Sequence, residues 1–252
     1  MPTLEKNGAA KRGLMQASAA IALAVAFVAA GLGACCLPQT TGMLAGMFSG
    51  MDNPSTPFSH DDLVQAAVAT RDYTVGSNDR EAAFAMLRDI NRNAQTPYAE
   101  ADEAALAAAP DVYTLDPEAL AHLDDVNRVI SMAGVAFAAI ALAAVALCVY
   151  LGARVGRRAV GSVLAGAGIA VLTVFAALAA WVVVDFNGFF AAFHSLFFAD
   201  GTWTFSYESL LITMYPPAFW MGMGAVWLTV TGTLSLASAI GGMLLRRTPA
   251  LR

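Results

Sequence analysis

The chain has 252 residues, of which 58% are hydrophobic and 13% are charged, and it is therefore too apolar for an ordinary soluble domain. The net charge of −5 averages over segregated charges, since residues 39–128 alone carry fifteen acidic and five basic residues. No basic stripe with interleaved aromatic residues occurs, so nucleic acid is excluded as an expected partner. The three cysteines have neither the spacing of a metal site nor that of a disulfide framework.

The first apolar run covers residues 14–37 and follows a short basic stretch, residues 1–13. It is uncharged and long enough to span a bilayer, which takes about 20 residues. It is longer than the ~7–15 apolar residues of a signal peptide, so we expect a retained first membrane helix. The alternative is a cleaved signal peptide, because Leu32-Gly33-Ala34-Cys35 resembles the lipobox that precedes a lipid-modified cysteine.

Residues 38–128 separate the first apolar run from the second and are expected to be mainly helical. The stretch 38–53 is rich in Gly, Met and Thr, and this composition predicts a connector. Residues 94–110 are rich in alanine and acidic residues and are weakly specified. A loose helix between Pro97 and Pro110 is the expectation there.

Capping residues mark the helix starts within this segment. Ser59, followed by acidic residues, predicts an N-cap, with the helix continuing over residues 63–73. A second amphipathic helix is expected over residues 81–91. Asp116 and Pro117 are typical of an N-cap and a first helical position, and this third helix is expected to continue into the next apolar run.

Three further apolar runs are each long enough to span a bilayer. With the first, they predict an all-α membrane protein with four transmembrane helices. The predicted spans are residues 14–37, 129–151, 161–184 and 218–245. The connecting segments are residues 38–128, 152–160 and 185–217, and the terminal segments are residues 1–13 and 246–252.

The basic residues predict the orientation, because Lys and Arg flank the cytoplasmic ends of membrane helices. They occur before the first span, between the second and third, and after the fourth. Both termini and the short loop are therefore predicted to be cytoplasmic, and the two longer segments extracytoplasmic. All three histidines fall in those two segments, so we expect histidine chemistry at the outer face of the cell membrane.

The segment after the third span is aromatic. Phe186–Trp203 holds six phenylalanines, one tryptophan and one histidine. The phenylalanines recur at helical spacing from Phe186 to Phe197, which predicts a short helix with an apolar stripe beside His194. A titratable imidazole in such a segment indicates a functional site. The alternative is an aromatic belt at the membrane interface with an incidental histidine.

Two groups of residues resemble motifs of a bacterial integral-membrane family, the Lit-like or DUF1461-type family that includes the lipoprotein intramolecular transacylase. One is His122-Leu123-Asp124-Asp125-Val126, before the second span. The other is Phe193-His194-Ser195-Leu196-Phe197-Phe198, followed by Asp200, Trp203 and Pro216-Pro217-Ala218-Phe219-Trp220. The resemblance covers the four-helix layout and is weakest across residues 40–110. Where the family usually has lysine after Asp-Val, this chain has Asn127.

The resemblance implies an acyltransferase. Members of the family move the sn-2 acyl chain of a diacylglyceryl-cysteine to the α-amino group of the same cysteine, which gives a lyso-form lipoprotein. The implied partners are membrane lipids and diacylated bacterial lipoproteins, and no cofactor is implied. His122 and His194 take the positions of the two motif histidines.

Histidine suits this chemistry, because an imidazole can take a proton from the attacking amine and return one to the departing oxygen near neutral pH. His122 is the expected base, and Asp125 shares its helix face and can orient the imidazole. The alternative for Asp125 is a solvated helix start where acids suit the helix dipole. His194 is the expected second group. Topology places both just outside the membrane, so we expect the two imidazoles to share one pocket.

The other expected site residues bind the substrate, with phenylalanines lining a slot for acyl chains and polar groups supporting the histidines. They are Phe190, Phe193, Phe197, Phe198, Trp203, Tyr113 and Arg128. His60 is expected to be solvated, and the spacing of the histidines does not support a metal site. The oligomeric state is left open.

Two other classes of function compete with an acyltransferase. The first is a non-enzymatic lipid- or lipoprotein-binding membrane protein that keeps the motifs for structure. The second is a small transporter, which the sequence favours least, because the apolar runs contain no charged residue and transport pathways need buried polar groups.

Overall fold

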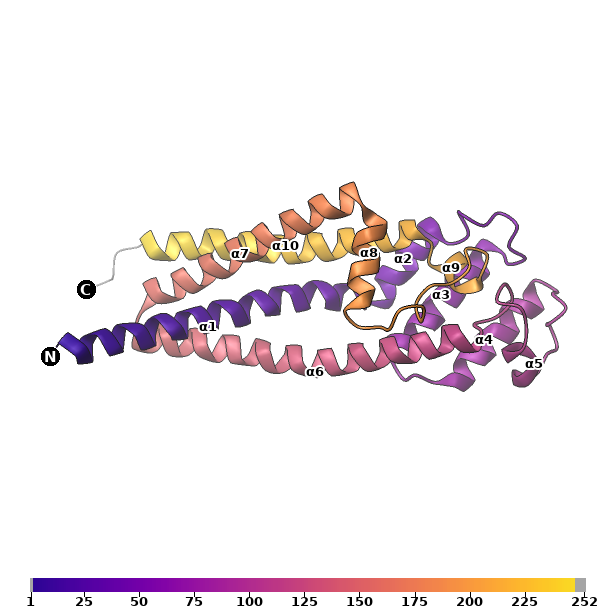
Figure 1. The fold of residues 1–252 in the computed structure, drawn as a ribbon, viewed down its shortest axis with the longest axis horizontal. Helices are drawn as coiled ribbons and strands as arrows, with labels where there is room; N and C mark the ends of the chain where they lie inside the picture. Colours follow the sequence, from indigo (N-terminus) through magenta and orange to yellow (C-terminus); the bar gives the residue numbers. More distant parts are fainter. Residues whose placement is uncertain (1, 248–252) are drawn as a thin grey trace. The chain divides into compact units, whose positions relative to one another are not determined.

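The computed structural model describes residues 2–247 and the side chains from residue 8 onward. The expectations for residue 1 and for residues 248–252 lie outside the described residues. The described chain is all-helical (Figure 1). Its helices are α1 (Pro2–Cys35), α2 (Pro38–Phe48), α3 (His60–Val75), α4 (Arg80–Asn93), α5 (Glu103–Ala107), α6 (Pro117–Arg154), α7 (Arg157–Val184), α8 (Phe186–Ser195), α9 (Leu210–Met214) and α10 (Pro217–Arg247).

Four of these helices, α1, α6, α7 and α10, are long and apolar enough to cross a membrane, which confirms the four predicted transmembrane helices. The predicted start of α6 is also confirmed, because the Asp116 carboxylate accepts a hydrogen bond from the Ala119 amide at 2.8 Å. At 38 residues α6 is about 57 Å long, whereas the hydrocarbon core of a bilayer is about 30 Å thick. Residues 117–128 precede its apolar run, which begins at Val129.

The chain divides into two compact units, each described here by itself. Unit 1 contains residues 1–33, 133–186 and 227–252, and unit 2 contains residues 34–132 and 187–226. Unit 1 is therefore built from the long apolar helices. Unit 2 contains the shorter helices, the beginning of α6 and most of α8, and it holds all three histidines.

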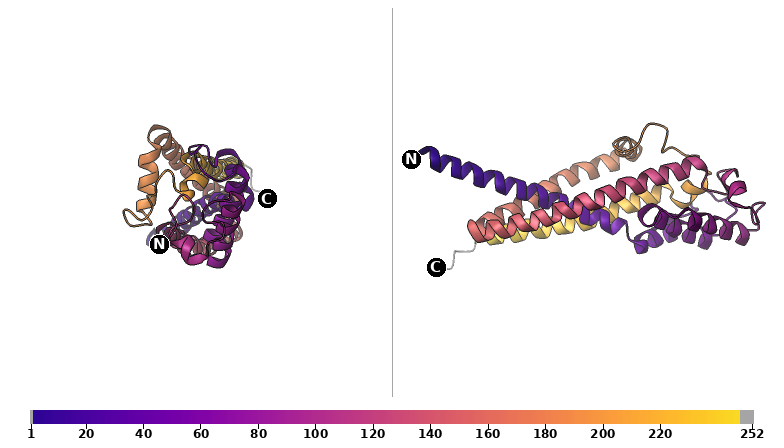
Figure 2. Two further views of the ribbon diagram at one scale, coloured as in Figure 1. Left: turned by 90° about the vertical axis from the view of Figure 1, so that its right-hand side faces the viewer. Right: turned by 90° about the horizontal axis from the view of Figure 1, so that it is seen from below.

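Small residues bring α7 and α10 close together in unit 1, and Figure 2 gives two further views of the helices. A β-carbon on Gly161 would lie 2.8 Å from the Gly242 carbonyl oxygen, and one on Gly168 would collide with the Ser235 carbonyl oxygen. A β-carbon on Gly166 would meet open space. Close backbone approach through small residues is how membrane helices associate, and Gly161 and Gly168 take part in it here.

The prediction of a connector over residues 38–53 is wrong, because helix α2 in unit 2 occupies Pro38–Phe48. The low helix propensity of Gly and Thr argued against a helix. Packing overrides it, since Leu44 and Ala45 are buried in the core of the unit and Pro38 suits a first helical turn. Tertiary burial of one face supplies most of the stability of short helices in proteins.

The helices that follow α2 begin close to where their caps predict. The Ser59 hydroxyl accepts from the Asp62 amide at 3.1 Å and caps α3, and the Asp79 carboxylate caps α4 in the same way. The weakly specified stretch 94–110 contains one short helix, α5, whose Leu106 is fully buried. The core also includes Leu63 and Leu87, which are 1% and 0% exposed.

The return of the aromatic segment is fastened to the segment between the first two spans. The Gly50 amide donates to the Thr213 carbonyl at 2.9 Å, and the Ser49 hydroxyl donates to the Met214 carbonyl at 2.7 Å. The Leu210 amide donates to the Asp111 carbonyl at 2.8 Å. These hydrogen bonds to backbone carbonyls hold α9 within the core of unit 2.

Candidate functional site

His122 lies in the second turn of α6, within unit 2, and is 9% exposed. Its neighbours Leu120 and Leu123 belong to the core of the unit, so the helix buries the face that carries them. The Nδ1 atom of the imidazole is buried and has no hydrogen-bond partner in the described part of the chain.

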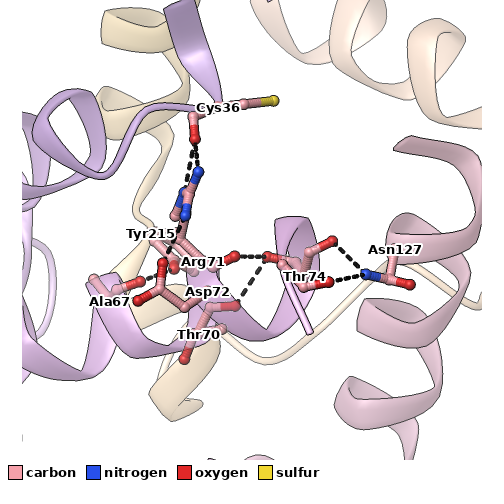
Figure 3. Close-up of polar contacts among 9 residues, drawn as sticks. Cys36, Ala67, Thr70, Arg71, Asp72, Thr74, Asn127 and Tyr215 are labelled. Carbon is pink, nitrogen blue, oxygen red and sulfur yellow. Dashed lines mark hydrogen bonds and ion pairs between the residues drawn. The ribbon is translucent and has the colours of Figure 1, made fainter. Parts of the chain in front are cut away.

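The end of α3 ties this part of α6 in place (Figure 3). The Asn127 side-chain amide donates to the Thr74 carbonyl at 3.1 Å and to the Gly76 carbonyl at 3.5 Å. Elsewhere on α3, the Arg71 guanidinium donates to the Cys36 carbonyl through Nε at 2.7 Å. Asn127 replaces the lysine that the resemblance expects, and here it satisfies carbonyls at the carboxyl end of α3.

Asp124 makes the second link between α3 and α6. Its carboxylate accepts from the Tyr73 hydroxyl, from Asn78 Nδ2 at 3.0 Å and from Arg80 Nη2 at 2.6 Å. Burial and this hydrogen bond raise the pKa of Tyr73 to about 12. Burial acts to raise the pKa of Asp124, but the three donors outweigh it and the pKa is lowered. Asp124 is therefore a structural anchor for the turn that carries His122.

His194 lies at the end of α8, the short aromatic helix that the phenylalanine spacing predicts. Its Nδ1 is 2.8 Å from the Phe190 carbonyl oxygen. A carbonyl oxygen only accepts, so Nδ1 carries the proton. In the neutral ring, Nε2 then carries the free lone pair. The helix thus fixes the tautomer of His194.

The two predicted site histidines converge, as the topology predicts. The ring centroids of His122 and His194 are 6.2 Å apart, with an angle of 28° between the planes. Both rings belong to unit 2. The Phe198 ring contacts both, with its centroid 4.9 Å from His122 and 5.9 Å from His194.

Aromatic side chains surround the pair. Trp203 stacks on His194 at 4.9 Å with an angle of 29° between the rings, and Phe205 lies 5.6 Å from His122. Six rings form an aromatic cluster at the two histidines: Phe190, Phe193, Phe197, Phe198, Trp203 and Phe205. Part of this cluster faces outward, since Phe197 is 49% exposed and the adjacent Leu196 is 75% exposed.

Burial among these rings keeps both imidazoles neutral at physiological pH. Burial, together with the smaller effect of the nearby His194, lowers the pKa of His122 to about 4, and the Asp125 charge acts in the opposite direction. Burial also lowers the pKa of His194, partly offset by its bond to the Phe190 carbonyl. A neutral imidazole is the form that accepts a proton.

Two polar atoms at the site, Nδ1 of His122 and Nε1 of Trp203, are buried without a hydrogen-bond partner among the residues that the structure describes. Most buried polar atoms in folded proteins have a partner, so unpaired ones require an explanation. Both atoms belong to rings that contact the His194 ring.

Other predicted site residues make different contacts. Asp125 pairs with Arg128 at 2.9 Å, and both side chains are exposed, so this carboxylate acts on His122 only through its charge. The Tyr113 ring lies 5.1 Å from the Tyr98 ring with an angle of 42° between the planes, and the Tyr113 carbonyl accepts from Asn91. His60 is exposed, as predicted.

Sequence reasoning missed Asp124 and Phe205. Asp124 lies two residues after His122 and so does not share its helix face, and its partners on α3 and α4 are distant in the sequence. Phe205 follows the aromatic motif in a loop and has no periodicity to mark it. In the part of the chain that the structure describes, no group of three or more His, Cys, Asp or Glu side chains could hold a metal ion.

The fold and the site together define a polytopic membrane protein with a two-histidine site in its helical segments outside the apolar spans. The protein belongs to the family described as lipoprotein intramolecular transacylase Lit, because the model of this family matches residues 77–220, more than half of the chain. The matched region contains both histidines. Membership implies intramolecular transacylase activity.

Solved structures agree with this assignment at the level of the fold. The membrane integral lipoprotein intramolecular transacylase Lit from Bacillus cereus matches with a TM-score of 0.68 and 15% sequence identity, over 94% of this chain and 96% of that chain. A variant of the same protein with one histidine replaced by arginine has a TM-score of 0.65, at 15% identity, over 97% and 95% of the two chains. A search of curated proteins by sequence gives no match.

Proposed function

We propose that this protein moves the sn-2 acyl chain of a lipoprotein diacylglyceryl-cysteine to the α-amino group of the same cysteine, with histidine as the acid and base. The observation that supports this most is the pair of neutral imidazoles of buried His122 and half-buried His194, whose ring centroids are 6.2 Å apart within an apolar ring cluster. An ester-to-amide shift needs a base beside an acyl-binding surface, and this arrangement supplies both.

In the proposed orientation the site lies at the outer face of the cell membrane. The arginines before α7 and at the end of α10 favour cytoplasmic ends there. With the predicted span boundaries, residues 38–128 and 185–217 are then extracytoplasmic. The substrate is a diacylated lipoprotein whose acyl chains remain in the outer leaflet while its glyceryl group meets the imidazoles.

His194 is the base in this proposal, in place of His122, because only His194 has a fixed tautomer. Its Nε2 takes a proton from the α-amino nitrogen as that nitrogen attacks the ester carbonyl carbon. The C–N bond forms and the carbonyl π electrons move to the oxygen. When the tetrahedral centre collapses, the bond to the sn-2 oxygen breaks and that oxygen takes the proton from Nε2, so the imidazole ends neutral and no acyl-enzyme forms.

His122 serves as the second group and stays neutral while His194 carries the proton. The two rings are close enough that a charge on one lowers the pKa of the other, so both are never cationic together. The unpaired Nδ1 of His122 leaves this ring free to hydrogen-bond a polar atom of the substrate glyceryl group. The charge of Asp125 moderates the pKa of His122 from a distance.

The aromatic cluster binds the acyl chain in this proposal. Phe193 and Phe197 are 39% and 49% exposed and offer apolar contact at the edge of the cluster, while Phe190 and Phe198 pack directly against the imidazoles. Arg128 forms an ion pair with Asp125 and Tyr113 contacts Tyr98, so neither is in ring or ion-pair contact with an imidazole in the described part of the chain. In this proposal they contribute as polar groups near the glyceryl linkage.

Mass spectrometry of lipoprotein N-termini tests this function. Purified protein in vesicles is mixed with a diacylated lipoprotein, and the N-terminal peptide is fragmented. The expected result is one acyl chain on the α-amino group and one on glycerol. An unchanged diacylglyceryl peptide, with binding of the lipoprotein intact, would contradict the proposal and favour a non-enzymatic lipoprotein-binding protein. The variant His60→Gln is the matched control, because His60 is exposed and lies apart from the aromatic cluster.

A further inference from the structure

Trp203 presents a buried hydrogen-bond donor that no residue in the described part of the chain accepts. Its Nε1 is buried and has no partner among residues 2–247, while its ring stacks on His194 at 4.9 Å and lies 6.3 Å from the Phe190 ring in an edge-on arrangement. An indole N–H can only donate, and burying it unpaired costs free energy. The position therefore fits an acceptor that is absent from the folded protein itself.

The backbone before Trp203 is built to place this ring. Gly201 has φ +84°, in the left-handed region that glycine adopts without strain. The Thr202 amide donates to the Ala199 carbonyl at 3.2 Å and closes a turn between α8 and Trp203. The turn directs the chain back so that the indole lies flat against the imidazole at the end of α8.

The other hydrogen-bond donors near His194 already have a partner. His194 Nδ1–H is used by the Phe190 carbonyl. The Arg128 guanidinium is exposed and paired with Asp125. The phenylalanines have no donor, so Trp203 provides the unused fixed N–H in contact with His194.

We propose that Trp203 is a catalytic residue whose Nε1–H donates a hydrogen bond to the substrate carbonyl oxygen as that oxygen becomes an oxyanion. This inference rests on the proposed function. When the amine nitrogen bonds to the carbonyl carbon, the π electron pair moves to the oxygen, and the indole donor stabilises that charge without giving up its proton. When the bond to the sn-2 oxygen breaks, the pair returns to re-form the carbonyl. Donors placed at a developing charge in a water-poor site favour the transition state over the ground state.

The sharpest test replaces Trp203 with 3-benzothienylalanine, in which sulfur takes the place of the N–H and the ring shape is kept. Removal of one oxyanion donor lowers kcat by about 10²–10³-fold, and KM is expected to change little because the donor acts in the transition state. Trp203→Phe is expected to lower kcat at least as much. Trp220→Phe is the matched control, since Trp220 also meets Phe190, at 6.2 Å, but lies apart from His194 in the ring contacts.

A binding measurement separates this role from a packing role. A lipopeptide with a phosphonate in place of the sn-2 ester carries a tetrahedral anion at the reacting centre. The wild-type protein is expected to bind it at least about tenfold more tightly than the benzothienyl variant, as charge-assisted hydrogen bonds are strong, whereas a diacyl lipopeptide is expected to bind both equally. Equal phosphonate affinity and unchanged kcat would overturn the inference. Lack of acyl transfer by the wild-type protein would instead defeat the proposed function.

Discussion

The imidazoles of His122 and His194 lie with their centroids 6.2 Å apart, although 72 positions separate them in the sequence and they belong to α6 and α8. The bonds that bring them together are made elsewhere in unit 2. Asp124 and Asn127 tie the beginning of α6 to α3, and the return after α8 is bonded to the ends of α2 and to Asp111. The pair therefore depends on the folding of the whole unit.

The first prediction concerns the coupling of the two histidines. His122→Gln and His194→Gln are each expected to abolish acyl transfer, because the proposed step needs a base and a second polar group at one carbonyl. The double variant is expected to be no worse than either single one, because groups that serve one step give non-additive losses. Rates of N-acylation from lipopeptide mass spectra measure this.

The comparison needs folded protein at equal expression, which thermal unfolding in detergent checks. Full acyl transfer by His194→Gln would contradict its role as the base. Transfer that survives in His122→Gln alone would leave His194 as the acting group and assign His122 a binding role.

The second prediction follows from the lowered pKa of His122. A histidine in the unfolded chain titrates near its ordinary value of ~6.5, whereas the folded protein protonates His122 only near pH 4. Between these values the unfolded state binds more protons, so stability rises with pH. The stability that depends on neutral His122 is complete above about pH 6.5 and is lost as the pH falls towards 4.

The measurement is the unfolding temperature in detergent from pH 4 to 7.5, for the wild type and for His122→Gln. The wild type is expected to lose stability more steeply below pH 6.5 than the variant, whose glutamine does not titrate. Parallel curves for the two proteins would show that His122 is not buried as a neutral ring.

Local sequence signals predicted the helices and one ring of the site, that of His194. They failed where the structure depends on contacts between residues that are distant in the sequence. Apolar length identified the four long helices, and Ser59 and Asp116 marked helix starts through their own hydrogen bonds. The helix α2 was missed because its stability comes from burial of Leu44 against other helices, and no local pattern records that burial. Trp203 was predicted as a substrate-binding residue that supports the histidines, but its stacking on His194 was not predicted, since the turn at Gly201 before it has no sequence periodicity.

The third prediction distinguishes the two neighbouring aspartates. Asp124→Asn is expected to lower the free energy of unfolding by about 1–3 kcal/mol, because buried Tyr73 and half-buried Asn78 lose a charged acceptor. Asp125→Asn is expected to change it by about 0–1 kcal/mol, as its pair with Arg128 is exposed. Denaturation of both variants in detergent tests the order, and a larger loss for Asp125→Asn would refute the anchoring role of Asp124.

One of these variants is also expected to change the titration of His122. Asp125→Asn removes a charge that raises the pKa of His122, so that pKa is expected to fall further while the fold is kept. Histidine ring resonances followed by NMR across pH 3–8 report this shift. An unchanged titration would mean that the Asp125 charge does not reach the ring.

The fourth prediction concerns orientation. Reporter domains fused near residues 90 and 205 are expected to give an extracytoplasmic signal, and those near residue 156 and at the carboxyl terminus a cytoplasmic one, because arginines favour the cytoplasmic side. Arg154, Arg157 and Arg158 in the short loop give the strongest bias. A cytoplasmic signal at residue 90 would move the site to the inner face and exclude an outer-leaflet substrate.

The last prediction uses two glycines on the same helix of unit 1. Alanine has higher helix propensity than glycine by roughly 0.5–1 kcal/mol, so Gly166→Ala, where the added carbon meets open space, is expected to leave stability unchanged or slightly raised. In Gly168→Ala the carbon meets the Ser235 carbonyl and the Ala239 backbone of α10, atoms that cannot move aside as a flexible side chain does. Overpacking of this kind costs about 1–3 kcal/mol, which exceeds the gain in propensity. Opposite shifts of the unfolding temperature in detergent are therefore expected, and equal shifts would show that α7 and α10 do not approach through Gly168.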